Sequence, residues 1–254
     1  YNTLTEQVAI VKKIRKVVSL PTVAAAVGVT GDYLQRAVNL FDVGANVICV
    51  DVAHGHHTLV QDAIGSIRDE LGHSVHIMAG NVATLSGFND LADWGADSIR
   101  VGIGGGSICS TRIQTGHGMP TFQSVLDCSQ SECDTTIIAD GGIKSSGDIV
   151  KALWAGASSI MTGKLFAGCK EANDPTSYRG MASSNAREVL KTDSNDSVAE
   201  EGIAIEVEDA GSAEDVITEL CNGIRSGMSY AGCNFISELT LSKEVGAVVQ
   251  TQNG

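Results

Sequence analysis

The stretch "VGIGGGSICSTR", residues 101–112, places one cysteine, Cys109, directly behind a run of glycines. A packing cysteine sits inside an apolar run, as Cys49 does in "NVICVDV", and needs no glycines beside it. Glycines remove side chains and let backbone amides and carbonyls face a ligand. The pattern therefore predicts a thiol presented for nucleophilic chemistry. A free cysteine in a flexible turn is the alternative, because a thiol is reactive only where its surroundings favour the thiolate.

Two further glycine turns, "ADGGIKSSGD" and "MTGKLFAG", suit phosphate binding. Backbone amides hold phosphate without requiring a positively charged side chain. Asp140 is acceptor-only when ionised and could take hydrogen bonds from a sugar diol, while Lys164 could add positive charge. A pair of ordinary glycine turns beside a solvated lysine is the alternative. The candidate phosphate residues are Gly141, Gly142, Gly163 and Lys164.

The elements that must position these residues follow a repeated pattern. A helical stretch ends in Gly-Ala and leads into a short Val/Ile/Ala-rich strand, with Gly-Ala pairs that begin at 44, 95 and 156. Such short, unalternating strands are typical of a parallel sheet buried on both faces. We expect six strands, near residues 22–28, 46–51, 75–79, 98–102, 135–139 and 158–162.

Alternation of strand and helix implies either a doubly wound sheet or a (β/α)8 barrel. Five strands end in Gly, Asn or Asp, and a barrel gathers all its strand ends on one face, so the pattern favours the barrel. We expect one domain over 1–254 with a lid at about 170–210. A barrel needs eight strands, so one or two βα units are expected to be absent from this chain and to precede Tyr1.

Composition narrows the class of partner. The chain of 254 residues has a formal charge of −13, which disfavours nucleic acid and membrane surfaces as partners. No apolar run approaches the roughly 20 residues of a membrane span. Seven cysteines without a C-x-x-C pair, in a sequence that shows no signal peptide, indicate a cytoplasmic protein.

Three histidines, His54, His56 and His57, follow the second expected strand. H-x-H-H is one way to begin a metal site, but no acidic or cysteine cluster at ligand spacing completes one. Lining of a cofactor cleft is the favoured interpretation.

Taken together, "VGIGGGSICSTR", "ADGGI", "YRGM" and "GIRSGMSYAG" resemble the IMP dehydrogenase / GMP reductase family. "AGNVAT" and "DVAHGH" are similar to that family's cofactor-side loops. The match runs in order from Ala24 to Gly232. The resemblance implies a (β/α)8 barrel, a homotetramer and oxidation or reduction of a purine nucleotide.

The resemblance also implies roles for individual residues. Cys109 would attack C2 of the purine, with Thr111 as a catalytic hydroxyl and Glu201 as the group that helps protonate the leaving amine. A solvated acidic pair with Glu200 is the alternative for Glu201. The implied substrate contacts are Ser107, Asp140, Gly141, Gly142, Gly163, Lys164, Gly180 and Met181. The implied cofactor contacts are Asp51, Asn81, Gly102 and Gly104, and potassium would bind backbone carbonyls of Gly104, Gly106 and Cys109.

The choice within the family depends on the span from Gly180 to Gly202. Dehydrogenases of the family activate water with an Arg-Tyr pair on a flap, and this span has none and is shorter. We therefore expect an NADPH-dependent GMP reductase. Dehydrogenase-like "YRGM" and "RSGMSYAG", together with Ala182, keep NAD-dependent IMP dehydrogenase as the alternative. A non-catalytic or truncated nucleotide-binding barrel and, more weakly, a flavin-phosphate barrel stay open.

Overall fold

The computed structural model describes residues 3–17, 22–180 and 201–241, and the chain forms two compact units. Unit 1 comprises residues 1–101 and 130–136, and unit 2 comprises residues 102–129 and 137–254. In unit 1 the elements are α1 (Leu4–Arg15), β1 (Ala24–Val27), α2 (Tyr33–Asp42), β2 (Val47–Asp51), α3 (Thr58–Leu71), the 3-10 turn η1 (Gly72–Ser74), β3 (His76–Val82), α4 (Leu85–Asp93) and β4 (Ser98–Val101).

Unit 2 continues the alternation of helix and strand. Its elements are α5 (Thr111–Thr115), α6 (Thr121–Cys128), β5 (Thr136–Asp140, whose first residue belongs to unit 1), α7 (Ser146–Ala155), β6 (Ser159–Met161), η2 (Lys164–Phe166), β7 (Ser177–Arg179), β8 (Ala204–Glu206), α9 (Ala213–Tyr230) and α10 (Ile236–Leu241). The strands β1 to β6 confirm all six expected strands, with their ends moved by at most three residues.

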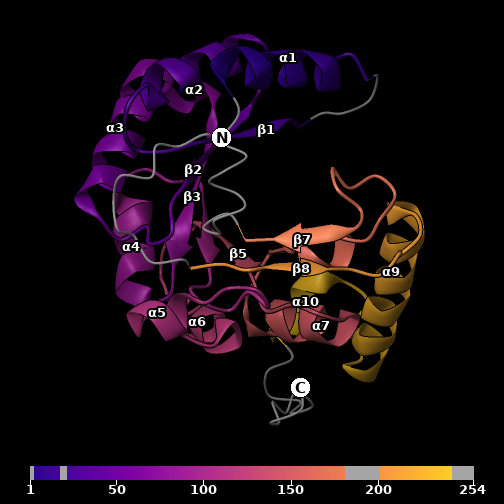
Figure 1. Cartoon of the computed structure of the whole chain (residues 1–254). Coiled ribbons are helices and arrows are strands. Elements are labelled where there is room, and N and C mark those ends of the chain that lie inside the picture. Colours follow the sequence, from indigo (N-terminus) through magenta and orange to yellow (C-terminus); the bar gives the residue numbers. More distant parts are fainter. Residues whose placement is uncertain (1–2, 18–21, 181–200, 242–254) are drawn as a thin grey trace. The chain divides into compact units, whose positions relative to one another are not determined.

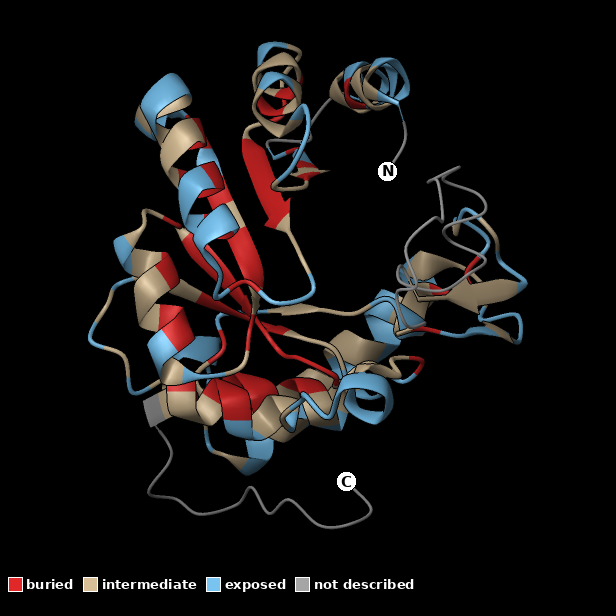
Figure 2. Ribbon diagram, turned by 60° about the vertical axis from the view of Figure 1, so that its left-hand side comes forward, coloured by how far each residue is buried: buried red, intermediate tan, exposed pale blue. Residues whose placement is uncertain are grey.

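The strands of unit 1 form a parallel sheet in the order β1-β2-β3-β4. Helices α2 to α4 lie along one side of these strands (Figure 1). Strands β2 and β4 are buried almost throughout, and β1 and β3 are partly buried, whereas the helices have both buried and exposed faces (Figure 2). Ile48, Ile77 and Ile99 are fully buried. Burial on both faces explains why the strand sequences are apolar without alternation.

The Gly-Ala pairs mark the turns from helix to strand, as the sequence pattern predicts. Gly44, Gly95 and Gly156 have φ of 108°, 105° and 122°. L side chains rarely adopt this backbone conformation, so glycine ends the helix at little cost.

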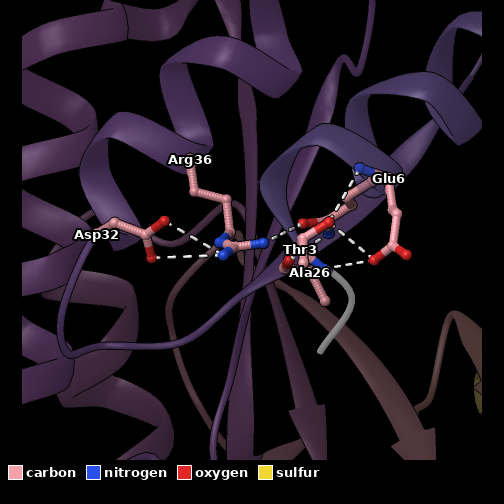
Figure 3. A network of polar contacts seen from close by, with 6 residues as sticks. Thr3, Glu6, Ala26, Asp32 and Arg36 are labelled. Carbon is pink, nitrogen blue, oxygen red and sulfur yellow. Dashed lines mark hydrogen bonds and ion pairs between the residues drawn. The ribbon is translucent and has the colours of Figure 1, made fainter. Parts of the chain in front are cut away.

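Helix α1 is attached to the rest of unit 1 by polar contacts (Figure 3). Thr3 and Glu6 form a capping box at its start. Gln7 donates to the carbonyl of Ala26 on β1 at 2.8 Å and accepts from Arg36 on α2 at 3.0 Å. Arg36 also pairs with Asp32 at 3.2 Å. These contacts fix α1 against both β1 and α2.

In unit 2, β5 and β6 pair in parallel. Helix α9 approaches α7 closely because two of its residues have no side chain: a Cβ on Gly223 would collide with Ser146, and one on Gly227 would lie 2.7 Å from a methyl of Val150. Strands β7 and β8 form an antiparallel pair within the segment expected to be a lid. Among the described residues, no helix combines the length and apolar character needed to cross a bilayer.

Candidate functional site

Cys109 lies on the loop that follows β4, and its side chain is half-buried. Its backbone N–H donates to the carbonyl of Gly106 at 3.1 Å, so residues 106–109 form a tight turn. The sulfur lies 3.2 Å from Oγ1 of Thr111, which donates a hydrogen bond of 2.7 Å to Oε2 of Glu201. The structure thus brings the three predicted catalytic side chains into one chain of contacts: thiol, hydroxyl and carboxylate.

Backbone pairing brings Glu201 to this place. Cys109 and Gly202 form an antiparallel bridge. On one side of it the N–H of Ser110 donates to the carbonyl of Glu201 at 3.0 Å, and on the other the N–H of Ile203 donates to that of Ile108 at 3.1 Å. The acidic side chain is therefore held in register with the cysteine loop, which a solvated acidic residue would not require.

A pocket opens beside the cysteine loop, in the same unit. Three backbone turns and one aromatic ring line it: Gly106, Ser107, Gly141, Gly142, Ile143, Lys144, Thr162, Gly163, Lys164 and Tyr178. Five predicted substrate residues (Ser107, Gly141, Gly142, Gly163 and Lys164) are among these, and the two lysines are exposed at the pocket. Gly141 and Gly142 have φ of 87° and 79°. The bare backbone and two ammonium groups suit a phosphate dianion.

Tyr178, on β7, is a pocket residue that sequence reasoning missed, although it begins the quoted motif "YRGM". A Cβ on Gly163 would lie 3.0 Å from the Tyr178 hydroxyl, so the ring packs against that turn. Burial raises the pKa of Tyr178, and the negative charge of Asp140 raises it further. The phenol therefore stays protonated and is a hydrogen-bond donor facing the pocket. Because the charge of Asp140 acts on Tyr178, Asp140, the predicted ribose contact, also lies near the pocket.

Thr121 connects the cysteine loop with the phosphate turn. Its Oγ1 occupies the space that a Cβ on Gly105 would need, and lies 3.4 Å and 3.5 Å from the Cβ positions of Gly102 and Gly142. Gly102 itself backs onto the carbonyl of Asp140, which a side chain there would strike. The Thr121 hydroxyl is buried and has no hydrogen-bond partner among the described residues. The two loops therefore pack around one small side chain.

Unit 1 carries a separate polar cluster at the carboxyl ends of its strands. Arg100, on β4, is buried and pairs with Asp51 of β2. The same guanidinium donates to Oδ1 of Asn81 at 2.6 Å and contacts the sulfur of Cys49 at 3.4 Å. The Asp51 side chain remains 31% exposed. A partly exposed carboxylate, which accepts hydrogen bonds, beside an amide, which can accept and donate them, fits the carboxamide of a nicotinamide ring.

Arg100 was also missed by the sequence analysis, although a charged residue inside the apolar strand "SIRV" is an unusual signal.

The structure gives local roles to two of the histidines in the loop after β2. His57 accepts from the N–H of Leu59 and so caps α3, and His56 lies 2.6 Å from Asp90 of α4. Among the described residues, no group of three or more His, Cys, Asp or Glu is placed to hold a metal ion. A backbone potassium site at Gly104, Gly106 and Cys109 is a separate matter and stays a prediction.

Three further residues were predicted to contact the substrate or the cofactor: Gly104, Gly180 and Met181. Gly104, with φ of 77°, packs against the stem of Arg112. Gly180 follows β7 and lies against the backbone of Gly202. Met181 lies outside the described residues.

A family model described as the IMP dehydrogenase / GMP reductase domain matches residues 2–254. The chain belongs to the IMP dehydrogenase / GMP reductase family. Membership confirms the resemblance read from the sequence motifs, and it confirms the (β/α)8 barrel as the fold class, of which β1 to β6 are the parallel strands in the described residues.

Relatives similar in sequence to this chain include proteins named IMP dehydrogenase. Inosine-5'-monophosphate dehydrogenase of Streptococcus pyogenes is 43% identical over 261 residues, covering 90% of this chain and 52% of the relative. The dehydrogenase of Nitrosopumilus maritimus is 40% identical over 247 residues, covering 88% and 51%. The chain spans about half the length of these relatives.

A solved structure of a GMP reductase is also similar to this chain. A cysteine-to-alanine variant of GMP reductase from Trypanosoma brucei, in complex with guanosine 5'-monophosphate, superposes with a TM-score of 0.82 at 34% identity, covering 94% of this chain and 56% of that one. The family is therefore shown, while the specific reaction is a matter for proposal.

Proposed function

We propose that this chain catalyses the NADPH-dependent reductive deamination of GMP to IMP and ammonia. The observation that carries the proposal is the contact chain from Cys109 through Thr111 to Glu201. It places a nucleophilic sulfur beside a carboxyl group that can deliver a proton through a hydroxyl. Purine C2 needs both, because its amine leaves only after it has been protonated.

The first half of the reaction needs no other group. The thiol of Cys109 adds across the double bond between C2 and the neighbouring ring nitrogen of GMP: the sulfur bonds to C2, and the thiol proton moves to the ring nitrogen. Glu201, acting through Thr111, protonates the amine. The C2–N bond to the amine then breaks and releases ammonia, and the ring nitrogen returns a proton to Glu201 as its double bond to C2 forms again. A thioimidate between Cys109 and C2 remains. Splitting the substitution into these steps lowers the barrier for each.

The second half is a reduction. A nicotinamide dinucleotide supplies a hydride to C2 when it is bound. The C2–S bond then breaks and returns the electron pair to the sulfur, which leaves IMP. Overall, GMP, NADPH and two protons give IMP, ammonium and NADP+. Asp51 and Asn81, held by Arg100 in unit 1, are our proposed contacts for the nicotinamide side. The cofactor contacts at Gly102 and Gly104 stay predictions of the family resemblance.

The pocket beside Cys109 is the proposed site of the nucleotide 5'-phosphate. Backbone turns at Ser107, Gly142 and Gly163 would supply N–H donors, and Lys144 and Lys164 would supply positive charge. Asp140 would accept from the ribose hydroxyls, while the protonated Tyr178 donates to the phosphate. The family's nucleotide complex, that of the Trypanosoma brucei GMP reductase variant, supports a purine monophosphate as ligand.

The reductase direction is favoured because it requires no activated water. Between Gly180 and Gly202 the sequence has no Arg-Tyr pair to generate one. IMP dehydrogenase is the second candidate, because relatives 40% and 43% identical carry that name. The homotetramer and the potassium site belong to the proposal as well.

The deciding experiment follows nicotinamide absorbance with the full chain in two mixtures, GMP with NADPH and IMP with NAD. We expect NADPH to be consumed with GMP. Turnover with IMP and NAD alone would establish the dehydrogenase instead. Nucleotide binding without turnover in either mixture would support a non-catalytic barrel.

The covalent step has its own test. A purine nucleotide with a reactive C2 substituent is incubated with the wild type, and the intact mass is measured. We expect one adduct, which Cys109→Ala abolishes. Cys133→Ala, a second half-buried thiol on the unit 1 side, is the matched control and should leave the adduct in place.

A further inference from the structure

We infer that Gly180 is a positioning residue, whose lack of a side chain sets where Glu201 meets Thr111. The inference rests on the proposed function. It differs from the base-contact role that the family resemblance implies for Gly180, because it is drawn from the packing of Gly180 against the backbone of Gly202.

Residues 201–203 form a strap, held from two sides. On one side the strap pairs with the cysteine loop: the N–H of Ser110 donates to Glu201, and that of Ile203 donates to Ile108. On the other side the N–H of Gly180 donates to the carbonyl of Ile203 at 3.1 Å. The strap therefore lies between the end of β7 and the cysteine loop, and its position fixes the backbone from which the Glu201 carboxylate projects.

The close approach depends on Gly180. A Cβ at this position would meet Cα of Gly202 at 3.0 Å, closer than real Cβ atoms normally come. The obstacle is backbone, so no side-chain rotation relieves it. The φ of Gly180 lies outside the left-handed range that favours glycine, so the effect of an alanine here comes from the space that its methyl group needs. An added methyl group must shift the strap by a few tenths of an ångström toward the cysteine loop.

The chemical consequence falls on Thr111. Its hydroxyl proton is donated to Glu201, so only its lone pairs face the sulfur of Cys109, which donates to it. When the carboxylate moves away, the proton path to the leaving amine is broken. The freed hydroxyl can then donate to the Cys109 thiolate and favour it. Displacement of the strap thus has two opposite signatures: slower turnover and a more reactive thiol.

The test compares Gly180→Ala, Glu201→Ala and the double variant. We expect each single variant to lower kcat at least tenfold while KM for the nucleotide changes less than about twofold, because general acid help is worth 10²–10⁴-fold. The double variant should lose no more than Glu201→Ala alone, since both changes remove one function. Gly65→Ala, which adds a methyl into open space on α3, is the matched control.

A second readout needs no turnover. Cys109 is alkylated with iodoacetamide at neutral pH and quantified by peptide mass. We expect about a fivefold faster rate in both single variants, the size of one hydrogen bond. Ile203→Pro removes the N–H that donates to the carbonyl of Ile108, and the position is exposed. This variant should also speed alkylation of Cys109, and it takes the place of Gly180→Ala if that variant fails to fold.

The outcomes separate the two proposals. A wild type without turnover in either nucleotide mixture overturns the proposed function, and alkylation alone then decides the role of Gly180. A faster rate in Glu201→Ala but not in Gly180→Ala or Ile203→Pro would overturn the inference. So would a rise in KM at unchanged kcat, or losses that add in the double variant, because these are what a base contact gives.

Discussion

Thr111 and Glu201 share a hydrogen bond of 2.7 Å although ninety positions separate them in the sequence. The bond joins the short helix after the cysteine loop to the segment that leads into β8. Through Thr111 it connects Glu201 to Cys109, the proposed nucleophile. The contact is therefore where the proposed chemistry is most open to test.

Glu201→Gln should lower kcat by about 10²- to 10⁴-fold with GMP and NADPH and leave KM nearly unchanged. The amide keeps the shape of the side chain but has no acidic proton to pass to the amine. Steady-state kinetics on the purified chain provide the measurement. Glu206→Gln, an exposed glutamate on β8, is the control and should behave as the wild type. A normal kcat in Glu201→Gln would assign the proton to another group.

Gly163→Ala should raise KM for the nucleotide about tenfold with little effect on kcat. The new Cβ would lie 3.0 Å from the Tyr178 hydroxyl and displace the ring from the phosphate pocket. Tyr178→Phe should act in the same direction, because it removes the donor while keeping the ring. Gly147→Ala, whose Cβ makes only ordinary contact with Ser145, is the control. Unchanged KM in both pocket variants would place the phosphate elsewhere.

The packing of α9 on α7 predicts opposite effects of two glycine substitutions. Gly223→Ala should lower the free energy of unfolding by about 1–3 kcal/mol, because its Cβ would strike Ser146. Gly147→Ala on α7 should raise it by about 0.5–1 kcal/mol, since alanine favours helix and the site has room. Urea denaturation of both variants checks this pair. Equal effects would mean that the helices are not in close contact.

From the buried thiol of Cys128 we predict a loss of folding stability at alkaline pH. Burial, helped by the charge of Asp127, raises its pKa from 9.0 to about 12. The unfolded chain releases this proton first, so the stabilising effect is complete below pH 9 and is lost as pH rises toward 12. Over that range the slope is up to about 1.4 kcal/mol per pH unit.

Comparison with Cys128→Ala isolates this contribution. The free energy of unfolding of the wild type should fall more steeply between pH 9 and 12 than that of the variant. Parallel curves for the two proteins would show that the Cys128 thiol is accessible to solvent.

Local sequence was enough to predict the strands and the turns. Apolar runs bounded by glycine located β1 to β6, and the Gly-Ala pairs located the turns where φ is positive. The glycine turns around Gly142 and Gly163, which line the pocket, were located for the same reason: each turn is made of residues that are adjacent in the chain. Their binding of phosphate stays a prediction.

Residues that work through distant neighbours were harder to predict. Tyr178 reaches its pocket only because β7 carries it there, and the role of Thr121 depends on glycines from two loops. Arg100 acts by joining side chains of three strands. A sequence pattern with a period of two or of about 3.6 carries no information about such meetings, because tertiary packing creates them.

The packing of Thr121 between glycines of two loops has a consequence for any redesign of this chain. The Thr121 oxygen fills the space that a Cβ on Gly105 would need, and it lies 3.5 Å from the position of a Cβ on Gly142. One side chain therefore packs against both turns. A larger side chain in the cysteine loop would therefore disturb the turn at Gly142 through Thr121, and the reverse. If the two loops hold the nucleophile and the phosphate as proposed, changes to one would alter both reactivity and affinity.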